Sequence, residues 1–191
     1  KKVRRRCTLL PTLRPRNGGP MMEAPLRPVL AHAKLNLTLH VTGQRADGYH
    51  LLDSLVVFAD IGDRLSIDAT AGLTLRAVGP YGDAVPPGPD NLVLRAARLI
   101  GARDAAITLD KQLPVASGMG GGSADAAAIL HLLAQEQRLS LPDTDALMRL
   151  GADLPVCMQA PQPCRMQGLG EVVTPLRGVP GLALVIVNPG V

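Results

Sequence analysis

The sequence predicts an α+β fold, because strand-like and helix-like segments do not follow one another in regular βαβα alternation. Apolar and polar residues alternate in stretches of residues 29–78, as in half-buried strands, whereas helical patterns dominate residues 91–150. Hydrophobic residues make up 47% of the 191-residue chain, which is enough for a core. Only Tyr49, Phe58 and Tyr81 are aromatic, so the core is expected to be aliphatic.

The first predicted strand covers residues 29–43, where apolar and polar side chains alternate. Its apolar face would contain Ala31, Ala33, Leu35, Leu37, Leu39 and Val41. Its polar face would carry Lys34 and Asn36. The pair Asp47-Gly48 then predicts a turn. The next predicted elements are strands at 51–58, 64–69 and 73–78 and a loop at 79–90.

Helical patterns follow this loop. Asp90 is a candidate N-cap for a helix over residues 91–102. The remaining predicted elements are a strand at 105–110, an Ala- and Leu-rich helix at 123–139, a helix at 143–150 that ends at Gly151, a turn near Asp153 and a buried strand at 182–190.

The net charge of +4 is concentrated at the start of the chain. Residues 1–20 contain seven basic and no acidic residues, and the remainder contains 13 basic against 16 acidic residues, a net charge of −3. A mildly acidic body with few aromatic residues argues against a nucleic-acid-binding protein. No apolar stretch approaches the roughly 20 residues of a membrane span. Residues 1–22 are expected to be a disordered basic extension, with a transit peptide as the alternative.

The cysteines do not indicate a metal site or a disulfide framework. Cys7, Cys157 and Cys164 are odd in number, form no CxxC pair and have no nearby histidine in sequence. Reduced thiols in a cytoplasmic protein are the simplest interpretation.

A glycine-rich segment, SGMGGGSADAA at residues 117–127, precedes the longest predicted helix. Glycines let backbone N–H groups approach a ligand, and a helix N-terminus adds partial positive charge. Together they form a candidate phosphate cradle, although the segment is neither a Walker A loop nor a GxGxxG dinucleotide motif. Ser123 and Asp125 beside the cradle would suit a triphosphate with Mg²⁺. The alternative is a flexible loop that caps a helix.

Three further motifs carry polar side chains whose roles remain open on spacing alone. Lys34 and Asn36 share a strand face and could be functional or merely solvated. Asp153, in LGADLPV, could act in chemistry or cap a helix. Tyr49 and His50 could stack on and hydrogen-bond a base, or simply pack at a turn.

The order of these motifs resembles one family closely. The chain resembles the GHMP kinases from about Ala31 to its end, because six motifs follow one another in the order typical of that family. They are AKLNL, TGQRADGYH, DNLVLRAA, LPVASGMGGGSADAA, LGADLPV and GLGE. The motifs are most similar to the member that phosphorylates the 2-hydroxyl of a cytidine diphospho-methylerythritol in non-mevalonate isoprenoid synthesis. The resemblance implies a mixed sheet with helices on one face, followed by a ferredoxin-like second domain.

The resemblance also implies roles for individual residues. Asp153 would be the catalytic base and Lys34 would hold it ionised beside the transferring phosphoryl group. Tyr49 and His50 would bind the cytosine, and Asn36 would contact the substrate near its reacting hydroxyl. The implied ATP site comprises Asn91, Lys111, Pro114, Val115, Ala116, Ser117, Gly118, Met119, Gly120, Gly121, Gly122, Ser123 and Ala124. Asn91 and Lys111 would lie near the adenine, and Ser123 would lie at the Mg²⁺ end of the phosphates.

The sequence departs from the family pattern at three places. Ala124 replaces the second of two serines, which removes a hydroxyl near the phosphates. The segment CMQAPQPCRMQGLG lacks the family's phenylalanines. The chain ends at NPGV, where the family continues into a further glycine-rich motif. We therefore expect an extension at 1–22, a GHMP N-terminal domain at 23–175 and the first strand of a truncated domain at 176–191.

Two alternatives to this cytidyl-substrate kinase remain at the level of sequence. Another GHMP small-molecule kinase is one, although Tyr49 and His50 would have no cytosine to bind there. A nucleotide-binding chain without catalytic activity is the other. The oligomeric state is not predicted by the sequence.

Overall fold

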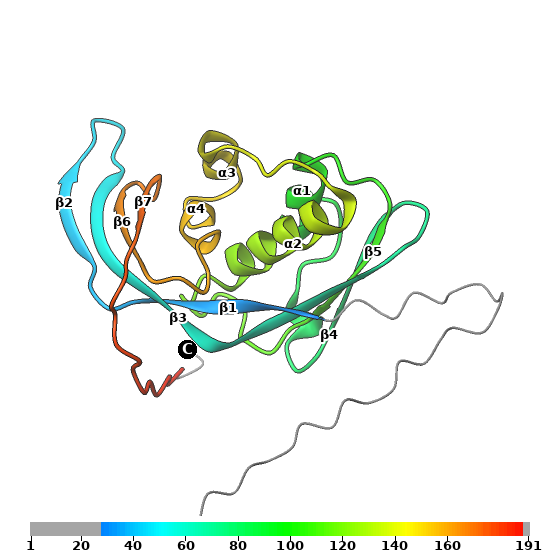
Figure 1. The fold of residues 1–191 in the computed structure, drawn as a ribbon, viewed down its shortest axis with the longest axis horizontal. Coiled ribbons are helices and arrows are strands. Elements are labelled where there is room, and N and C mark those ends of the chain that lie inside the picture. The colour runs from blue at the N-terminus through cyan, green and yellow to red at the C-terminus, as the bar shows by residue number, and fades with distance from the viewer. Residues whose placement is uncertain (1–27, 189–191) are drawn as a thin grey trace, which may run out of the picture.

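The computed structural model describes residues 28–188 (Figure 1). The strands are β1 (Val29–Asn36), β2 (His40–Gln44), β3 (His50–Asp68), β4 (Leu73–Val78), β5 (Ala105–Asp110), β6 (Cys164–Gly168) and β7 (Val172–Pro175). The helices are α1 (Leu92–Leu99), α2 (Gly121–Gln137), α3 (Thr144–Leu150) and α4 (Leu154–Cys157), with a short 3-10 helix η1 (Gly82–Ala84). The α+β class is confirmed.

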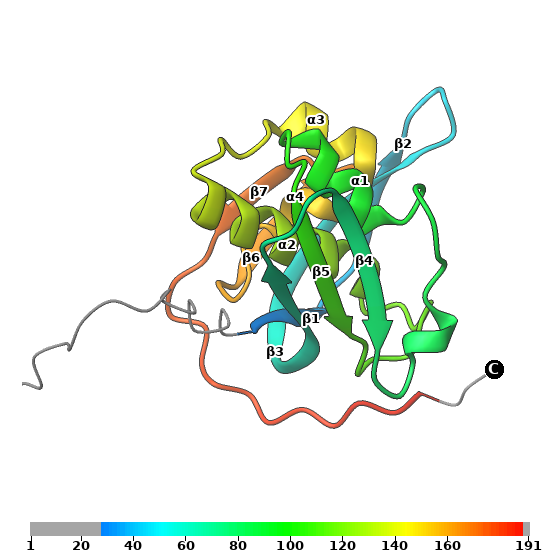
Figure 2. The ribbon, with the colours of Figure 1, turned by 90° about the vertical axis from the view of Figure 1, so that its right-hand side faces the viewer.

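The long strand β3 organises the sheet, because four other strands pair with it. One edge of β3 pairs antiparallel with β2 and then with β1, and the other edge pairs antiparallel with β6 and then with β5. β4 extends the sheet parallel to β5, as Figure 2 shows, and β7 extends it beyond β6. The sheet is therefore mixed, with one parallel pair.

The helices lie on one face of this sheet and close the main hydrophobic core (Figure 1). α2 lies at the centre of the core, and its buried side chains are almost all aliphatic. The largest fully buried apolar side chains are Leu65, Ile107, Leu109, Ile129, Leu130, Leu133 and Leu154. The core is aliphatic, as the composition predicts.

The strand predicted at 29–43 is interrupted at residues 37–39, where the chain leaves the sheet, and it forms two strands, β1 and β2. Leu37, Leu39 and Val41, predicted on its apolar face, are exposed. A register shift between His32 and Lys34 also breaks the alternation. Ala33, which lies within the shift, and Lys34 are both buried.

Other elements differ more locally from the sequence predictions. The strands predicted at 51–58 and 64–69 form one continuous strand, β3. The N-cap of α1 is Asn91 rather than Asp90, because the Asn91 side chain accepts a hydrogen bond from the Val93 N–H. β6 and β7 were not predicted, since they are only five and four residues long and end at Gly168 and Pro175. The helices after residues 120 and 143 and the turn at Gly48 are confirmed.

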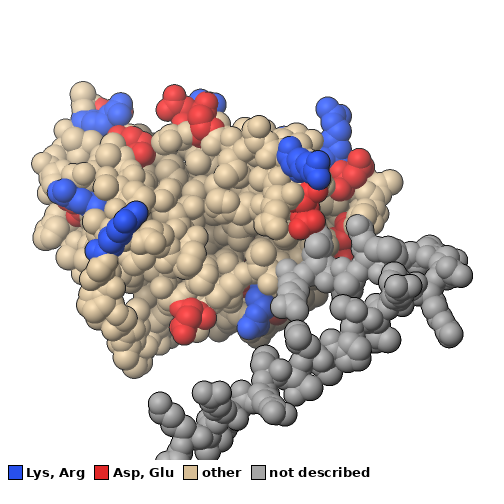
Figure 3. Space-filling view, viewed as in Figure 1, with Lys and Arg blue, Asp and Glu red and all other residues tan. Residues whose placement is uncertain are grey.

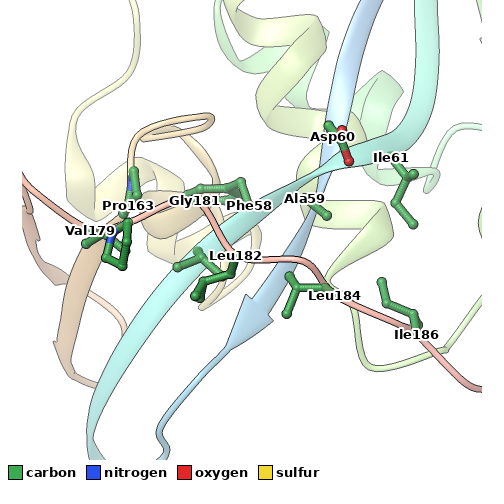
Figure 4. A pocket seen from close by; sticks show the side chains of 12 residues that line it. Phe58, Ala59, Asp60, Ile61, Pro163, Val179, Gly181, Leu182, Leu184 and Ile186 are labelled. Carbon is green, nitrogen blue, oxygen red and sulfur yellow. The ribbon is translucent and has the colours of Figure 1, made fainter.

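The segment predicted as a buried strand at 182–190 is not a strand over residues 182–188, which are largely exposed. This segment runs across the face of the sheet opposite the helices (Figures 1 and 2). Leu182, Leu184 and Ile186 and the β3 residues Ala59 and Ile61 line an apolar cavity of about 490 Å³ there (Figure 4). The extension predicted at residues 1–22 lies outside the described residues.

On the face shown in Figure 3, acidic and basic side chains are interspersed and lie mostly near the periphery. The described residues of this face therefore present no continuous basic surface of the kind that neutralises nucleic-acid phosphates. Among residues 28–188, no helix has the length and apolar character required to cross a bilayer.

A substitution at Gly62 tests how closely β1 and β3 pack. A Cβ atom at Gly62 would stand 1.9 Å from the Ala31 carbonyl oxygen, so Gly62→Ala must push the two strands apart. We expect a loss of about 3 kcal/mol in the free energy of unfolding, measured by urea denaturation. Gly43→Ala in β2 is the control, because its Cβ would meet only Leu51 Cδ1 at 3.5 Å. Equal losses in both variants would contradict this account.

Candidate active site

The glycine-rich segment forms one wall of a cavity of about 480 Å³ between α1, the end of β5 and the start of α2. Left-handed backbone at Gly118 (φ 76°) and Gly120 (φ 65°) turns the chain into the N-terminus of α2. The cavity is lined by Val85, Pro86, Asp90, Asn91, Leu92, Val93, Leu109, Lys111, Pro114, Val115, Ala116, Ser117, Gly118, Gly120, Gly121, Gly122, Ser123, Asp125 and Asp153. An apolar wall and a glycine-lined helix N-terminus suit a nucleotide.

Eleven of the thirteen residues predicted for the ATP site therefore line one cavity. The other two, Met119 and Ala124, have buried side chains. Met119 packs with Ala33 and Leu113, and its carbonyl accepts a hydrogen bond from the Lys34 N–H at 3.0 Å. The N–H of Ala124 donates to the Gly120 carbonyl within α2. These two residues hold the loop rather than line the cavity.

Lys34 and Asp153 form an ion pair at the end of this cavity. Lys34 Nζ donates to Asp153 Oδ2 at 2.8 Å, with the lysine side chain 7% and the aspartate side chain 38% exposed. A Cβ at Gly120 would stand 3.3 Å from Lys34 Cε and 3.6 Å from Asp153 Oδ2. The pair therefore lies directly against the glycine-rich loop, and the structure brings together two residues that are 119 positions apart.

Asn36 lies on the same strand as Lys34, and a chain of hydrogen bonds fixes its side chain. The buried Ser54 hydroxyl donates its single proton to the Thr38 carbonyl at 2.5 Å. The Ser54 oxygen must then accept from Asn36, and Asn36 Nδ2 lies 2.6 Å from it. The amide orientation of Asn36 is therefore determined, and its carbonyl oxygen is turned away from Ser54.

A second charged cluster lies behind the glycine-rich loop. Lys111 Nζ donates to Asp63 Oδ2 at 2.6 Å and to Asp125 Oδ2 at 2.7 Å, and all three side chains are buried. Asp63 Oδ1 accepts the N–H groups of Gln112 and Leu113. The cluster joins β3, the beginning of the loop and the N-terminal part of α2.

The sequence hypothesis put Asp125 beside a triphosphate with Mg²⁺, whereas in the structure its side chain is buried against Lys111. Burial raises its pKa to about 7, although the neighbouring Lys111 ammonium opposes the shift. Asp125 Oδ1 has no hydrogen-bond partner among the described residues, whereas both oxygens of Asp63 accept hydrogen bonds. The raised pKa therefore favours the protonated form of Asp125.

The remaining predicted residues occupy different parts of the molecule. Asn91 Nδ2 donates to the Pro86 carbonyl at 2.9 Å, so its side chain clamps the loop before α1 as well as capping the helix. Ser123 lies in the first turn of α2, on the cavity wall. Tyr49 and His50 lie at the tip of the hairpin of β2 and β3, and Tyr49 is 66% exposed. Along β3 this tip is about 20 Å from Val56, the partner of Asn36.

Sequence reasoning missed Asp63 and Ser54. Asp63 lies within an apolar strand pattern, next to Gly62, and a buried charge in such a pattern was the available signal. Ser54 follows Asp53 in the same strand and carries no motif of its own. Burial raises the pKa of Cys157 to about 12 and that of Cys164 to about 11, which favours the protonated thiols near neutral pH.

Comparison with known proteins identifies relatives of this fold and site. Residues 91–167 match the GHMP kinases N terminal domain. The chain is 57% identical over 162 residues to a 4-diphosphocytidyl-2-C-methyl-D-erythritol kinase of Cereibacter sphaeroides, covering 84% of this chain and 58% of the relative. It is 58% identical over 167 residues to the kinase of the same name from Dinoroseobacter shibae, covering 86% of this chain and 57% of the relative.

A solved structure is similar as well. The crystal structure of 4-(cytidine 5′-diphospho)-2C-methyl-D-erythritol kinase superposes with a TM-score of 0.64 at 34% identity, covering 78% of this chain and 55% of that chain. The present chain thus spans somewhat more than half the length of the relatives it matches.

The raised pKa of Asp125 makes the stability of the chain depend on pH. The folded state holds a proton that the unfolded carboxyl, with its ordinary pKa near 3.8, releases, so stability falls as the pH rises from about 4 to about 7. Asp125→Asn cannot ionise and should escape this loss. We expect the free energy of unfolding of the variant, relative to that of the wild type, to rise by on the order of 1 kcal/mol per pH unit in this window. Urea unfolding at pH 5 and pH 8 measures the difference. A difference that is the same at both pH values would contradict the assignment.

Proposed function

We propose that this chain, whose residues 91–167 match the GHMP kinases N terminal domain, is a GHMP kinase that binds ATP and transfers the γ-phosphoryl group to the 2-hydroxyl of 4-diphosphocytidyl-2-C-methyl-D-erythritol. The observation that carries the proposal is the Lys34–Asp153 ion pair, at 2.8 Å, against a glycine-lined nucleotide cavity. A nucleotide linked to methylerythritol is multiply charged and does not cross membranes, so we place the activity in the cytoplasm.

Different residues of the cavity would have different roles in phosphoryl transfer. The glycine-rich loop and the N-terminus of α2 offer backbone N–H groups to the phosphates. The apolar wall near Val85 and Leu92 would receive the adenine, beside the loop that Asn91 clamps. Asp153 accepts the proton of the attacking hydroxyl, and Lys34 fixes the carboxylate and supplies positive charge to the transferring group.

A magnesium ion fits this arrangement as a companion of the triphosphate. No group of three or more His, Cys, Asp or Glu side chains in residues 28–188 could hold a metal alone. Mg²⁺ bound to nucleotide phosphates requires only one or two protein ligands, and the hydroxyl of Ser123 and the carboxylate of Asp153 line the same cavity. When bound, the ion would neutralise phosphate charge. Ala124 offers no second hydroxyl for this purpose.

The acceptor would extend from the ion pair toward the hairpin of β2 and β3. Asn36 lies two residues after Lys34 on β1, and its amide, oriented by Ser54, leaves a carbonyl oxygen that would accept a hydrogen bond from the acceptor. Tyr49 and His50 would hold the cytosine by stacking and by hydrogen bonds to its edge. The distance along β3 suits an elongated acceptor that carries a cytidine diphosphate group better than a small alcohol such as homoserine or mevalonate.

Asp153→Asn tests the proposed base. The amide cannot accept the hydroxyl proton, so we expect kcat to fall by about a hundredfold to ten-thousandfold, with a much smaller change in ATP affinity. Phosphoryl transfer is measured on the 191-residue chain and on a chimera that adds the C-terminal part of the Cereibacter sphaeroides relative. Asp143→Asn, at the N-cap of α3, is the matched control and should retain full activity, because asparagine caps helices equally well. An unchanged kcat in Asp153→Asn would refute the assignment.

Substitutions at Tyr49 test the cytidyl acceptor. Tyr49→Ala removes the stacking surface and should raise the KM for the acceptor by about ten- to a hundredfold, without a comparable change in the KM for ATP. Tyr49→Phe preserves the ring and should stay close to the wild type. If Tyr49→Ala left the acceptor KM unchanged, the exposed tyrosine would not be part of the acceptor site.

A further inference from the structure

Lys111 places a cation beside the proposed phosphate cradle but does not leave it free. A Cβ atom at Gly121, the first residue of α2, would stand 3.2 Å from Lys111 Nζ. The ammonium therefore lies against the backbone at which phosphate oxygens would be received. Its hydrogen bonds to Asp63 and Asp125, at 2.6 and 2.7 Å, direct it into the protein instead.

The two carboxylates do not have equivalent roles. Asp63 also accepts two backbone N–H groups at the beginning of the loop, so it is needed for the path of the chain. Asp125 accepts no backbone N–H among residues 28–188: its Oδ2 accepts from Lys111 and its Oδ1 has no partner there. With both carboxylates ionised, the cluster carries a net charge of −1, which opposes the approach of a polyphosphate.

This inference rests on the proposed nucleotide cavity. We propose that Asp125 is an affinity-determining residue, which holds the Lys111 ammonium away from bound phosphates and so keeps nucleotide binding weaker than the cation alone would make it. A kinase must release ADP in every catalytic cycle, and a free lysine against the phosphates would slow that release. Asp125 acts through Lys111 and is not itself expected to touch the substrate.

The sign of the effect separates this role from a structural one. Asp125→Asn keeps an acceptor oxygen for Lys111 and the size of the side chain but removes the negative charge. We expect the variant to bind a non-hydrolysable ATP analogue, adenylyl imidodiphosphate with Mg²⁺, roughly tenfold more tightly at pH 8, with a steeper dependence on salt. A residue that only supported the loop would weaken binding when changed.

Calorimetric titration of the wild type, Asp125→Asn and Asp104→Asn makes the comparison. Asp104 is exposed and bonds the Gly72 N–H, so Asp104→Asn changes the net charge equally and should leave the affinity as in the wild type. If Asp125→Asn kept its unfolding midpoint but bound the ATP analogue no more tightly than the wild type, the inference would be overturned and the proposed function would stand. Absence of nucleotide binding by the wild type would instead overturn the proposed function, and this inference with it.

A measurement on the wild type does not depend on the folding of any variant. Pyridoxal 5′-phosphate with borohydride labels lysines that an anionic reagent can reach. We expect Lys111 to remain unlabelled in the folded wild-type chain, because both carboxylates hold its ammonium. Labelling of Lys111 in a peptide map at the same rate as in the unfolded chain would show a free ammonium and overturn the inference.

Discussion

A lysine buried between two carboxylates is the constraint on which the glycine-rich loop depends. Charges of this kind are very costly to bury without partners, so the segments that carry Asp63, Lys111 and Asp125 must remain together in the folded chain. They come from β3, from the residue after β5 and from the N-terminal part of α2. The loop at residues 114–122 joins two of these segments, and both of its ends are therefore fixed.

The same loop is held in its middle by β1. The Lys34 N–H donates to the Met119 carbonyl, and the Lys34 side chain reaches Asp153 just beyond Gly120. One residue thus anchors the loop through its backbone and orients the candidate base through its side chain. A register shift in β1 lies directly before Lys34, and Ala33 and Lys34 are both buried. An irregular strand is in this way coupled to the candidate chemistry.

Most of the fold could be predicted from local patterns, and the exceptions have physical causes. β4, β5, α2 and α3 follow from period-two alternation, alanine and leucine content and capping, which act within a few residues. β6 and β7 could not be predicted, because they gain their stability from pairing, β6 with β3 and β7 with β6, rather than from their own pattern. The segment at 182–188 shows the reverse case, since a strand-like pattern without a paired neighbour does not form a strand.

The sequence by itself determined the glycine-rich loop, the helix that follows it and the residue types at the candidate site, because these depend on local backbone freedom and on motif order. The tertiary structure alone decided which charges meet. Lys34 lies 119 positions from Asp153, and Lys111 lies 48 positions from Asp63. Nothing local distinguishes these lysines from solvated ones. Only the packing of β1, β3 and α2 around the loop removes them from water and selects their partners.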